Sequence, residues 1–212
     1  MSEQYQPHPV RGRLNAACFA AFDGVINRAM RRPKEQAFAD LPDEVVEIGP
    51  GVGANFRFLR PGTRLIAIEP NPHMHARLIA RAAVHRIHIE LRSVKGERVD
   101  LPDASAVAVI SSLVLCTVER PAAVVAEVRR ILEPGGRYSF VEHVAAPEGT
   151  ALRRIQHGIR RPWAWAFEGC SCERDTAGTI RAAGFRAVDV TDYCLRSVIV
   201  PVNTQIAGTA IA

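Results

Sequence analysis

Residues 45–55 read VVEIGPGVGAN, and this stretch decides the fold of the chain. An apolar strand runs into a turn with three glycines at alternate positions, and a helix is expected over residues 54–59. A second apolar run, LIAI, leads to Glu69, about 20 residues after Gly49. Glycines let the backbone approach a ligand, and a carboxylate at the next strand end accepts hydrogen bonds from a ribose. The glycine turn and Glu69 together predict a nucleoside cofactor lying across the ends of two parallel strands.

Length and composition predict one domain over residues 1–212, because 212 residues with 48% hydrophobic content suffice for a full core. No apolar run approaches the roughly 20 residues that a bilayer-spanning helix needs. The N-terminus lacks the charged region and apolar stretch of a secretory signal. The five cysteines are scattered and odd in number, which favours free thiols in a reducing compartment. We therefore expect a cytoplasmic protein.

The net charge of +5 comes almost entirely from arginine, with Lys34 and Lys95 as the two lysines. The arginines are spread along the chain without a nucleic-acid-reading motif, so we expect no nucleic-acid partner. Cys170 and Cys172 lie close together in sequence, but no second close pair accompanies them. Because zinc sites usually have CxxC-type spacing, we expect no metal.

Strand and helix patterns alternate along the chain. Strands are expected over 44–48, 64–69, 87–92, 106–111, 136–142, 185–192 and 204–211, and further helices over 34–40, 72–84, 121–132, 151–168 and 175–183. This βαβ alternation predicts an α/β fold, a Rossmann-like doubly wound parallel sheet covered by helices on both faces.

Residues 1–40 are expected to form an N-terminal helical arm on a core of residues 41–212. Apolar residues recur at helical spacing between residues 14 and 30. This helix either packs on the core, as a lid over the site, or lies on a membrane surface.

The glycine turn also satisfies the GxGxxA pattern of dinucleotide-binding proteins, so a nicotinamide cofactor is an alternative. Glu47, two residues before Gly49, argues against it, because a carboxylate there would repel a pyrophosphate at the helix N-terminus. The same carboxylate suits a positively charged sulfonium ligand. In addition, residues 131–137, ILEPGGR, end a helix and open a strand through a sharp glycine turn.

With these motifs the chain resembles class I S-adenosylmethionine-dependent methyltransferases. Residues 45–55 match their glycine motif, 65–70 their ribose motif and 131–143 their LxPGG strand. A closer resemblance, to the methyltransferase-like thiol S-methyltransferases of animal membranes, is carried by GANF at 53–56, PNP at 70–72, GE at 96–97, LVLC at 113–116, EHVAA at 142–146 and FEGC at 167–170. Unlike that family, this chain is expected to have no hydrophobic N-terminal anchor. The resemblance implies a seven-stranded sheet of order 3-2-1-4-5-7-6 with the last strand antiparallel.

The resemblance also implies the cofactor, S-adenosylmethionine, with S-adenosylhomocysteine as product. The glycines would approach its methionine and ribose portions, Glu69 would take the ribose hydroxyls, and the strand end at 111–113 would face the methionine ammonium. The expected cofactor-binding residues are Glu47, Gly49, Gly51, Gly53, Asn55, Glu69, Pro70, Gly96, Glu97, Ser111, Ser112 and Leu113. Lys95 stands where relatives often place an aspartate, and it cannot accept a hydrogen bond from the adenine.

The acceptor is expected to be a small apolar molecule, in the first place a thiol. A thiol has a pKa of about 8.5, so it needs no strong general base at neutral pH. The alternatives are a phospholipid N-methyltransferase, a quinone or phenol O-methyltransferase, and a cofactor-binding module without turnover. His143, at the end of the fifth strand, is the candidate for acid–base or orienting work and for acceptor contact, or else it is structural. Glu142 is expected to hold local backbone or His143.

Residues 145–175 are expected to be the acceptor region, because aromatic side chains there follow several arginines. The expected substrate-binding residues, besides His143, are Arg160, Trp163, Trp165 and Phe167. Such a segment forms an apolar pocket, a lid that packs on the core, or a contact with anionic lipid. Peripheral membrane contact would therefore run through residues 14–34 or 151–167.

Overall fold

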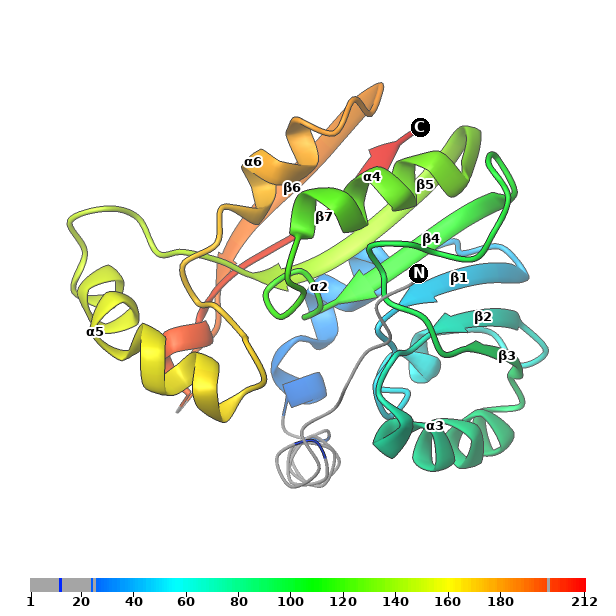
Figure 1. Ribbon diagram of the computed structural model, residues 1–212, viewed down its shortest axis with the longest axis horizontal. Helices are drawn as coiled ribbons and strands as arrows, with labels where there is room; N and C mark the ends of the chain where they lie inside the picture. Colours follow the sequence, from blue (N-terminus) through cyan, green and yellow to red (C-terminus); the bar gives the residue numbers. More distant parts are fainter. Residues whose placement is uncertain (1–11, 13–23, 25, 198) are drawn as a thin grey trace.

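A seven-stranded sheet forms the centre of the computed structural model, which describes residues 12, 24, 26–197 and 199–212 (Figure 1). The strands are β1 (Glu44–Ile48), β2 (Arg64–Ile68), β3 (His88–Arg92), β4 (Ala106–Ser112), β5 (Leu132–His143), β6 (Ala187–Cys194) and β7 (Thr204–Ile211). Their order is β3-β2-β1-β4-β5-β7-β6, and β7 runs antiparallel to both of its neighbours. The predicted α/β fold, strand order and antiparallel last strand are confirmed.

Within the described residues, five helices and two short 3-10 turns precede or connect the strands. They are α2 (Arg31–Ala37), η1 (Phe56–Phe58), α3 (Pro72–His85), α4 (Pro121–Ile131), α5 (Ala151–Ala166), α6 (Thr176–Arg181) and η2 (Val200–Val202). Polar side chains cap the N-termini of two of these helices. Asn71 accepts a hydrogen bond from the backbone N–H of His73 at α3, and Thr150 accepts one from the backbone N–H of Arg153 at α5. No helix in the described part of the chain combines the length and apolar character needed to cross a bilayer.

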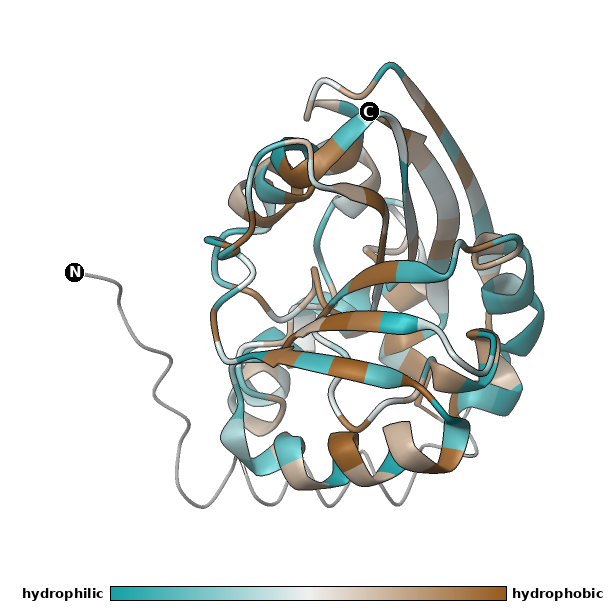
Figure 2. Ribbon diagram, turned by 90° about the vertical axis from the view of Figure 1, so that its right-hand side faces the viewer, coloured by the Kyte–Doolittle hydropathy of each residue, from teal (hydrophilic) through white to brown (hydrophobic). Residues whose placement is uncertain are grey.

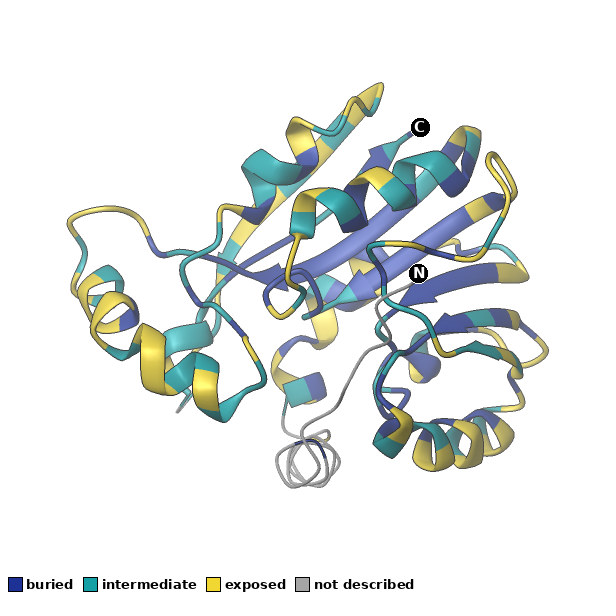
Figure 3. Cartoon of the chain, in the orientation of Figure 1, coloured by how far each residue is buried: buried dark blue, intermediate teal, exposed yellow. Residues whose placement is uncertain are grey.

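Alternate residues of the strands feed two apolar layers, one on each face of the sheet. Val46 and Val109 face a layer shared with α4 and α6, whereas Val45 and Ile110 face a layer shared with α2 and α3. Figure 2 shows the hydrophobic residues concentrated in the strands. In Figure 3 β4 and β5 are mostly buried, whereas α5, at one end of the molecule, is mostly exposed. The two layers hold the strand ends in place around the site.

Several predicted boundaries are shifted by two or three residues, as at α2 (predicted over 34–40) and β6 (predicted over 185–192), and two expectations differ more from the structure. The expected helix over 54–59 is wrong: only the 3-10 turn Phe56–Phe58 forms, and Leu59 is already extended. Pro61 bars any continuation of the turn, because the residue before a proline, here Arg60, disfavours helical backbone. β5 begins at Leu132 rather than near residue 136, because Leu132 pairs with Ala106 before the glycine turn shifts the register. The predicted helix between residues 14 and 30 lies largely outside the described residues.

Candidate cofactor and acceptor site

A cavity of about 300 Å³ opens at the carboxyl ends of β1, β2 and β4. The strand order reverses here, since β2 and β4 lie on opposite sides of β1, and ligands bind at such switch points in doubly wound sheets. The expected cofactor residues that line the cavity are Gly49, Gly51, Asn55, Glu69, Pro70, Gly96, Glu97, Ser112 and Leu113. Glu47, Gly53 and Ser111 are not among its lining residues.

The glycine turn has left-handed backbone at all three glycines, with φ of 63°, 58° and 82° at Gly49, Gly51 and Gly53. A Cβ on Gly49 would lie 2.6 Å from Cγ2 of Val114, and one on Gly53 would lie 2.7 Å from Cε2 of Phe56. A Cβ on Gly51 would meet no protein atom within 4 Å. Packing therefore requires glycine at 49 and 53, whereas Gly51 keeps space open toward the cavity.

Glu69 ends the second apolar run and faces this turn. Its Oε2 accepts from the backbone N–H of Gly51 and its Oε1 from that of Asn71, both at 2.9 Å. Burial raises the pKa of the Glu69 carboxyl, and the two backbone hydrogen bonds oppose that rise. Each carboxylate oxygen keeps a further lone pair. The carboxylate is thus fixed from the protein side and can still accept hydrogen bonds from the cavity side.

A chain of buried polar groups runs behind the turn. Asn55 donates from Nδ2 to Oε1 of Glu47 at 2.7 Å, and Lys34 donates from Nζ to Oδ1 of Asn55 at 2.8 Å and to Oδ1 of Asn27 at 3.0 Å. Burial raises the pKa of Glu47 to about 7, although Asn55 and Lys34 lower it. Glu47 therefore holds Asn55 in place from behind the cavity wall.

Lys34 is a cavity residue that the sequence analysis missed. It is 2% exposed and lines the cavity together with Lys95, so both lysines of the chain lie there. Their rarity in an arginine-rich chain was the available signal. Lys34 places a positive charge on the wall next to Asn55.

Glu142 holds the loop that follows β4. Its carboxylate accepts from the backbone N–H groups of Val114 and Leu115 at 3.2 and 3.1 Å and from the Ser111 hydroxyl at 3.0 Å. Burial raises the pKa of Glu142 to about 7. The expectation that Glu142 holds local backbone is confirmed. Ser111 donates to Glu142 and does not line the cavity, whereas Ser112 and Leu113 do.

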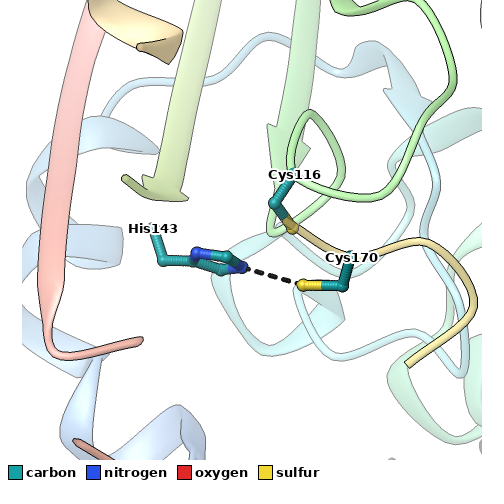
Figure 4. A group of neighbouring side chains, drawn as sticks. All are labelled: Cys116, His143 and Cys170. Atoms are coloured by element: carbon teal, nitrogen blue, oxygen red, sulfur yellow. Dashed lines mark hydrogen bonds between the residues drawn. The ribbon is translucent and has the colours of Figure 1, made fainter. Parts of the chain in front are cut away.

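His143, at the end of β5, is 3% exposed and does not line the cavity. Its Nε2 lies 3.2 Å from Sγ of Cys170, and Cys116 completes a compact group with them (Figure 4). Trp163 donates from Nε1 to the Cys170 sulfur at 3.3 Å. The hydrogen bond from Cys116, and then those from His143 and Trp163, lower the pKa of the Cys170 thiol against the effect of burial. The same contact raises the pKa of Cys116.

Of the other expected acceptor residues, two are half-buried near His143 and two are exposed. Trp163 and Phe167 are half-buried, with ring centroids 4.3 Å apart, and Trp163 reaches the His143–Cys170 pair. Arg160 is exposed, and Trp165 is 68% exposed. None of the four lines the cavity, although Glu168, just beyond them, does.

α5 is tied to the segment after β5 by a buried glutamine. Gln156 donates to the carbonyls of Val144 and Pro201 and accepts from the backbone N–H of Ala146. This side chain ties the helix to the segment that leaves β5, and so positions Trp163 beside Cys170.

Comparison with known proteins matches the same part of the chain. A family model described as a methyltransferase domain matches residues 46–140. Human thiol S-methyltransferase TMT1B is 33% identical over 197 residues, which cover 87% of this chain and 80% of that protein. Human thiol S-methyltransferase TMT1A is 33% identical over 176 residues, or 77% of this chain and 72% of that protein.

Solved structures agree on the fold. The crystal structure of an S-adenosylmethionine-dependent methyltransferase from Aquifex aeolicus superposes with a TM-score of 0.65 at 13% identity, covering 92% of this chain and 97% of that chain. The cofactor of the present chain is S-adenosylmethionine, as the matched domain and the cavity at the switch point indicate. The chain belongs to the family of S-adenosylmethionine-dependent methyltransferases that includes these thiol S-methyltransferases.

Proposed function

We propose that this enzyme transfers the methyl group of S-adenosylmethionine to a small, apolar thiol. The observation that carries the proposal is its kinship, over most of the chain, with enzymes named for that reaction. The cavity supports it, because Leu113, Val114 and Val118 give the wall beyond the β4 end an apolar character. Such a wall favours an apolar acceptor over a strongly hydrated one.

In this proposal the cofactor lies across the ends of β1, β2 and β4. Glu69 accepts hydrogen bonds from the ribose, and the Gly49–Gly51 backbone approaches the ribose and methionine portions. Ser112 and Leu113 face the methionine ammonium, and the positive charge of Lys34 suits the methionine carboxylate. Pro70, Gly96 and Glu97 form the adenine side. Asn55 is held by Glu47 and Lys34 for this role.

Methyl transfer is an in-line displacement on a carbon already activated by the sulfonium, so the protein mainly aligns the nucleophile with the methyl group. A thiol acceptor has a useful thiolate fraction near neutral pH and needs no strong base. We therefore give His143 a role in holding the acceptor sulfur rather than in removing a proton from a hydroxyl. Trp163 and Phe167 form the apolar side of that position.

We also infer that residues 1–212 act as one domain, because Ile26 and Asn27, from the described part of segment 1–40, line the cavity. α5 exposes Ile155 and Trp165 as well as Arg154, Arg160 and Arg161. Apolar side chains beside cations favour peripheral contact with anionic lipid. An apolar thiol would then reach the enzyme from the membrane surface.

The test is release of S-adenosylhomocysteine by the purified protein over a panel of alkyl and aryl thiols, phenols, quinols, small amines and phosphatidylethanolamine vesicles. We expect the highest kcat/KM with apolar thiols. A higher kcat/KM with phosphatidylethanolamine or a quinol than with any thiol would show that this compound, and not a thiol, is the preferred acceptor. Cofactor binding without turnover on any panel member would contradict the proposal.

A further inference from the structure

We propose that Cys116, His143 and Cys170 form a binding site for a thiophilic metal ion, Zn²⁺ in the first place, that leaves one coordination position for a thiolate. One ligand atom from each residue lies within 4.8 Å of the others, and all three side chains are buried. They come from three separate segments: the loop after β4, the end of β5 and the connection between α5 and α6 (Figure 4). The expectation of no metal came from spacing in the sequence, which does not show ligands that the fold brings together.

The ligand set matches zinc in chemistry and size. Two thiolates and an imidazole are ligands that Zn²⁺ prefers over the hard oxygen sites of Mg²⁺ or Ca²⁺. Zn–S bonds of about 2.3 Å and Zn–N bonds of about 2.0–2.1 Å place tetrahedral ligand atoms roughly 3.4–3.8 Å apart. The His143 Nε2 to Cys170 Sγ distance is 3.2 Å, and no pair in the group exceeds 4.8 Å. Shifts of about 1 Å or less would close the three around one ion.

The surroundings also favour a cation at this point. Trp163 donates to the Cys170 sulfur, which is the kind of outer hydrogen bond that supports a metal-bound thiolate. Nδ1 of His143 is buried and has no hydrogen-bond partner among the described residues. Buried polar groups are normally satisfied, so the protein groups described here leave this imidazole incompletely paired. An ion bound at Nε2 would leave Nδ1 as it is, so the support for a cation here comes from the Trp163 hydrogen bond and the three converging ligand atoms.

The site has three protein ligands, and it borders the cavity without lining it. Among the described residues Cys172 is buried nearby but is not part of the group, and Glu142 is engaged by backbone N–H groups. Three ligands and an open position are the arrangement of catalytic rather than structural zinc sites. Val114 and Thr117, on either side of Cys116, line the cavity, as does Glu168 before Cys170.

The open position suits the thiol acceptor, a step that rests on the proposed function. A thiol that binds Zn²⁺ there releases its proton to solvent and is held as a thiolate. Its sulfur then forms the bond to the methyl carbon while the bond from that carbon to the cofactor sulfonium breaks. The products are a neutral thioether, which is a weaker ligand and dissociates, and S-adenosylhomocysteine.

Metal analysis of the full chain tests the site without reference to activity. We expect about one zinc ion per chain after loading with Zn²⁺ under reducing conditions and gel filtration. Cys116→Ser and Cys170→Ser should lose it, whereas Cys172→Ser, a buried cysteine of the same segment, and the exposed Cys194→Ser should retain it. Absence of stoichiometric zinc in the parent protein, or equal retention by all four variants, would overturn the proposal. A Cys116–Cys170 disulfide that persists in the reduced preparation would do the same.

Cobalt substitution tests the site in the unmodified chain, so it does not depend on variants that fold. Co²⁺-loaded protein should show thiolate-to-cobalt charge-transfer absorption, and butanethiol should shift the visible cobalt bands. Absence of the charge-transfer band would refute the site, and bands unmoved by butanethiol would refute the open position. If the metal-free protein methylates butanethiol at the full rate, the thiolate-holding role fails while the proposed function stands. If cobalt and butanethiol bind but no thiol is ever methylated, the proposed function fails while the metal site stands.

Discussion

Replacing Glu69 by Gln is expected to weaken S-adenosylmethionine binding by about a hundredfold. The Glu69 carboxylate is buried and held by the backbone N–H groups of Gly51 and Asn71 at 2.9 Å each. An amide at this position turns one NH₂ group toward one of these N–H donors, so either orientation places donor against donor. It also removes a charged acceptor for two ribose hydroxyls. Hydrogen bonds to charged groups contribute about 1.5 kcal/mol or more each, which gives about 3 kcal/mol for the pair.

Calorimetric titration with S-adenosylmethionine and S-adenosylhomocysteine at pH 8 measures this loss, since burial raises the pKa of Glu69 and the carboxylate must be ionised. Glu90→Gln, an exposed acid on β3, is the matched control and should bind like the parent protein. A 2′-deoxyribose analogue of the product separates ribose contact from general damage. It should bind the parent protein more weakly than the product does, and the difference should shrink in Glu69→Gln. A folded Glu69→Gln protein with a Kd within about threefold of the parent would refute the ribose assignment.

Three further outcomes are expected. Gly49→Ala and Gly51→Ala share left-handed backbone strain of about 1–2 kcal/mol, but Gly49→Ala adds a clash with Val114. Urea unfolding should therefore show Gly49→Ala to be less stable than Gly51→Ala by about 1–3 kcal/mol, whereas Gly51→Ala should mainly lose cofactor affinity. Equal stabilities of the two variants would contradict the packing difference. Burial raises the pKa of Glu47 from 4.5 to about 7 in the folded state, where Lys34 and Glu69 are the neighbouring charged groups. The folded state therefore binds a proton that the unfolded state has lost between these pH values. The free energy of unfolding should fall by up to about 3 kcal/mol as pH rises from 5 to 8. Glu47→Gln should remove the share of the fall that Glu47 contributes in urea titrations, while Glu142, whose pKa burial also raises to about 7, keeps a comparable share. An unchanged slope would contradict the assignment. Reversing the charges of Arg160 and Arg161 to Glu should abolish co-sedimentation with anionic vesicles at low salt, whereas the same double change at Arg64 and Arg77, exposed arginines outside both candidate segments, should not. Binding that the α5 change does not reduce would exclude α5 as the contact.

The sheet and much of the cavity wall could be predicted from the sequence because their signals are local. Apolar runs, glycines and prolines mark the strand ends, and the order of parallel strands then brings Gly49 and Glu69 to one edge. The helix expected over 54–59 forms only as a 3-10 turn, and Pro61, visible in the sequence, bars its continuation at Arg60. Local signals therefore predict the framework and the side of the sheet on which a ligand lies.

Side-chain networks could not be predicted in the same way, because their members are distant in sequence. The role of Lys34 depends on Asn55, which is 21 residues away. His143 contacts Cys170, 27 residues away, and the group with Cys116 exists only after α5 has packed. The packing of α5 depends in turn on Gln156 and the carbonyl of Pro201, 45 residues apart. A search for neighbouring ligand pairs such as Cys170 and Cys172 cannot find a group of this kind.

The last two residues of β5 link the two halves of the site. Glu142 fixes the backbone at Val114 and Leu115, and this loop both lines the cofactor cavity and carries Cys116. His143, the next residue, contacts Cys170 in the proposed acceptor region. A displacement of the β5 end would therefore move the cofactor wall and the cysteine–histidine group together. In-line transfer requires the methyl carbon and the acceptor sulfur to be held at a fixed separation. A single buried strand end that anchors both sides provides that constraint without any direct contact between cofactor and acceptor residues.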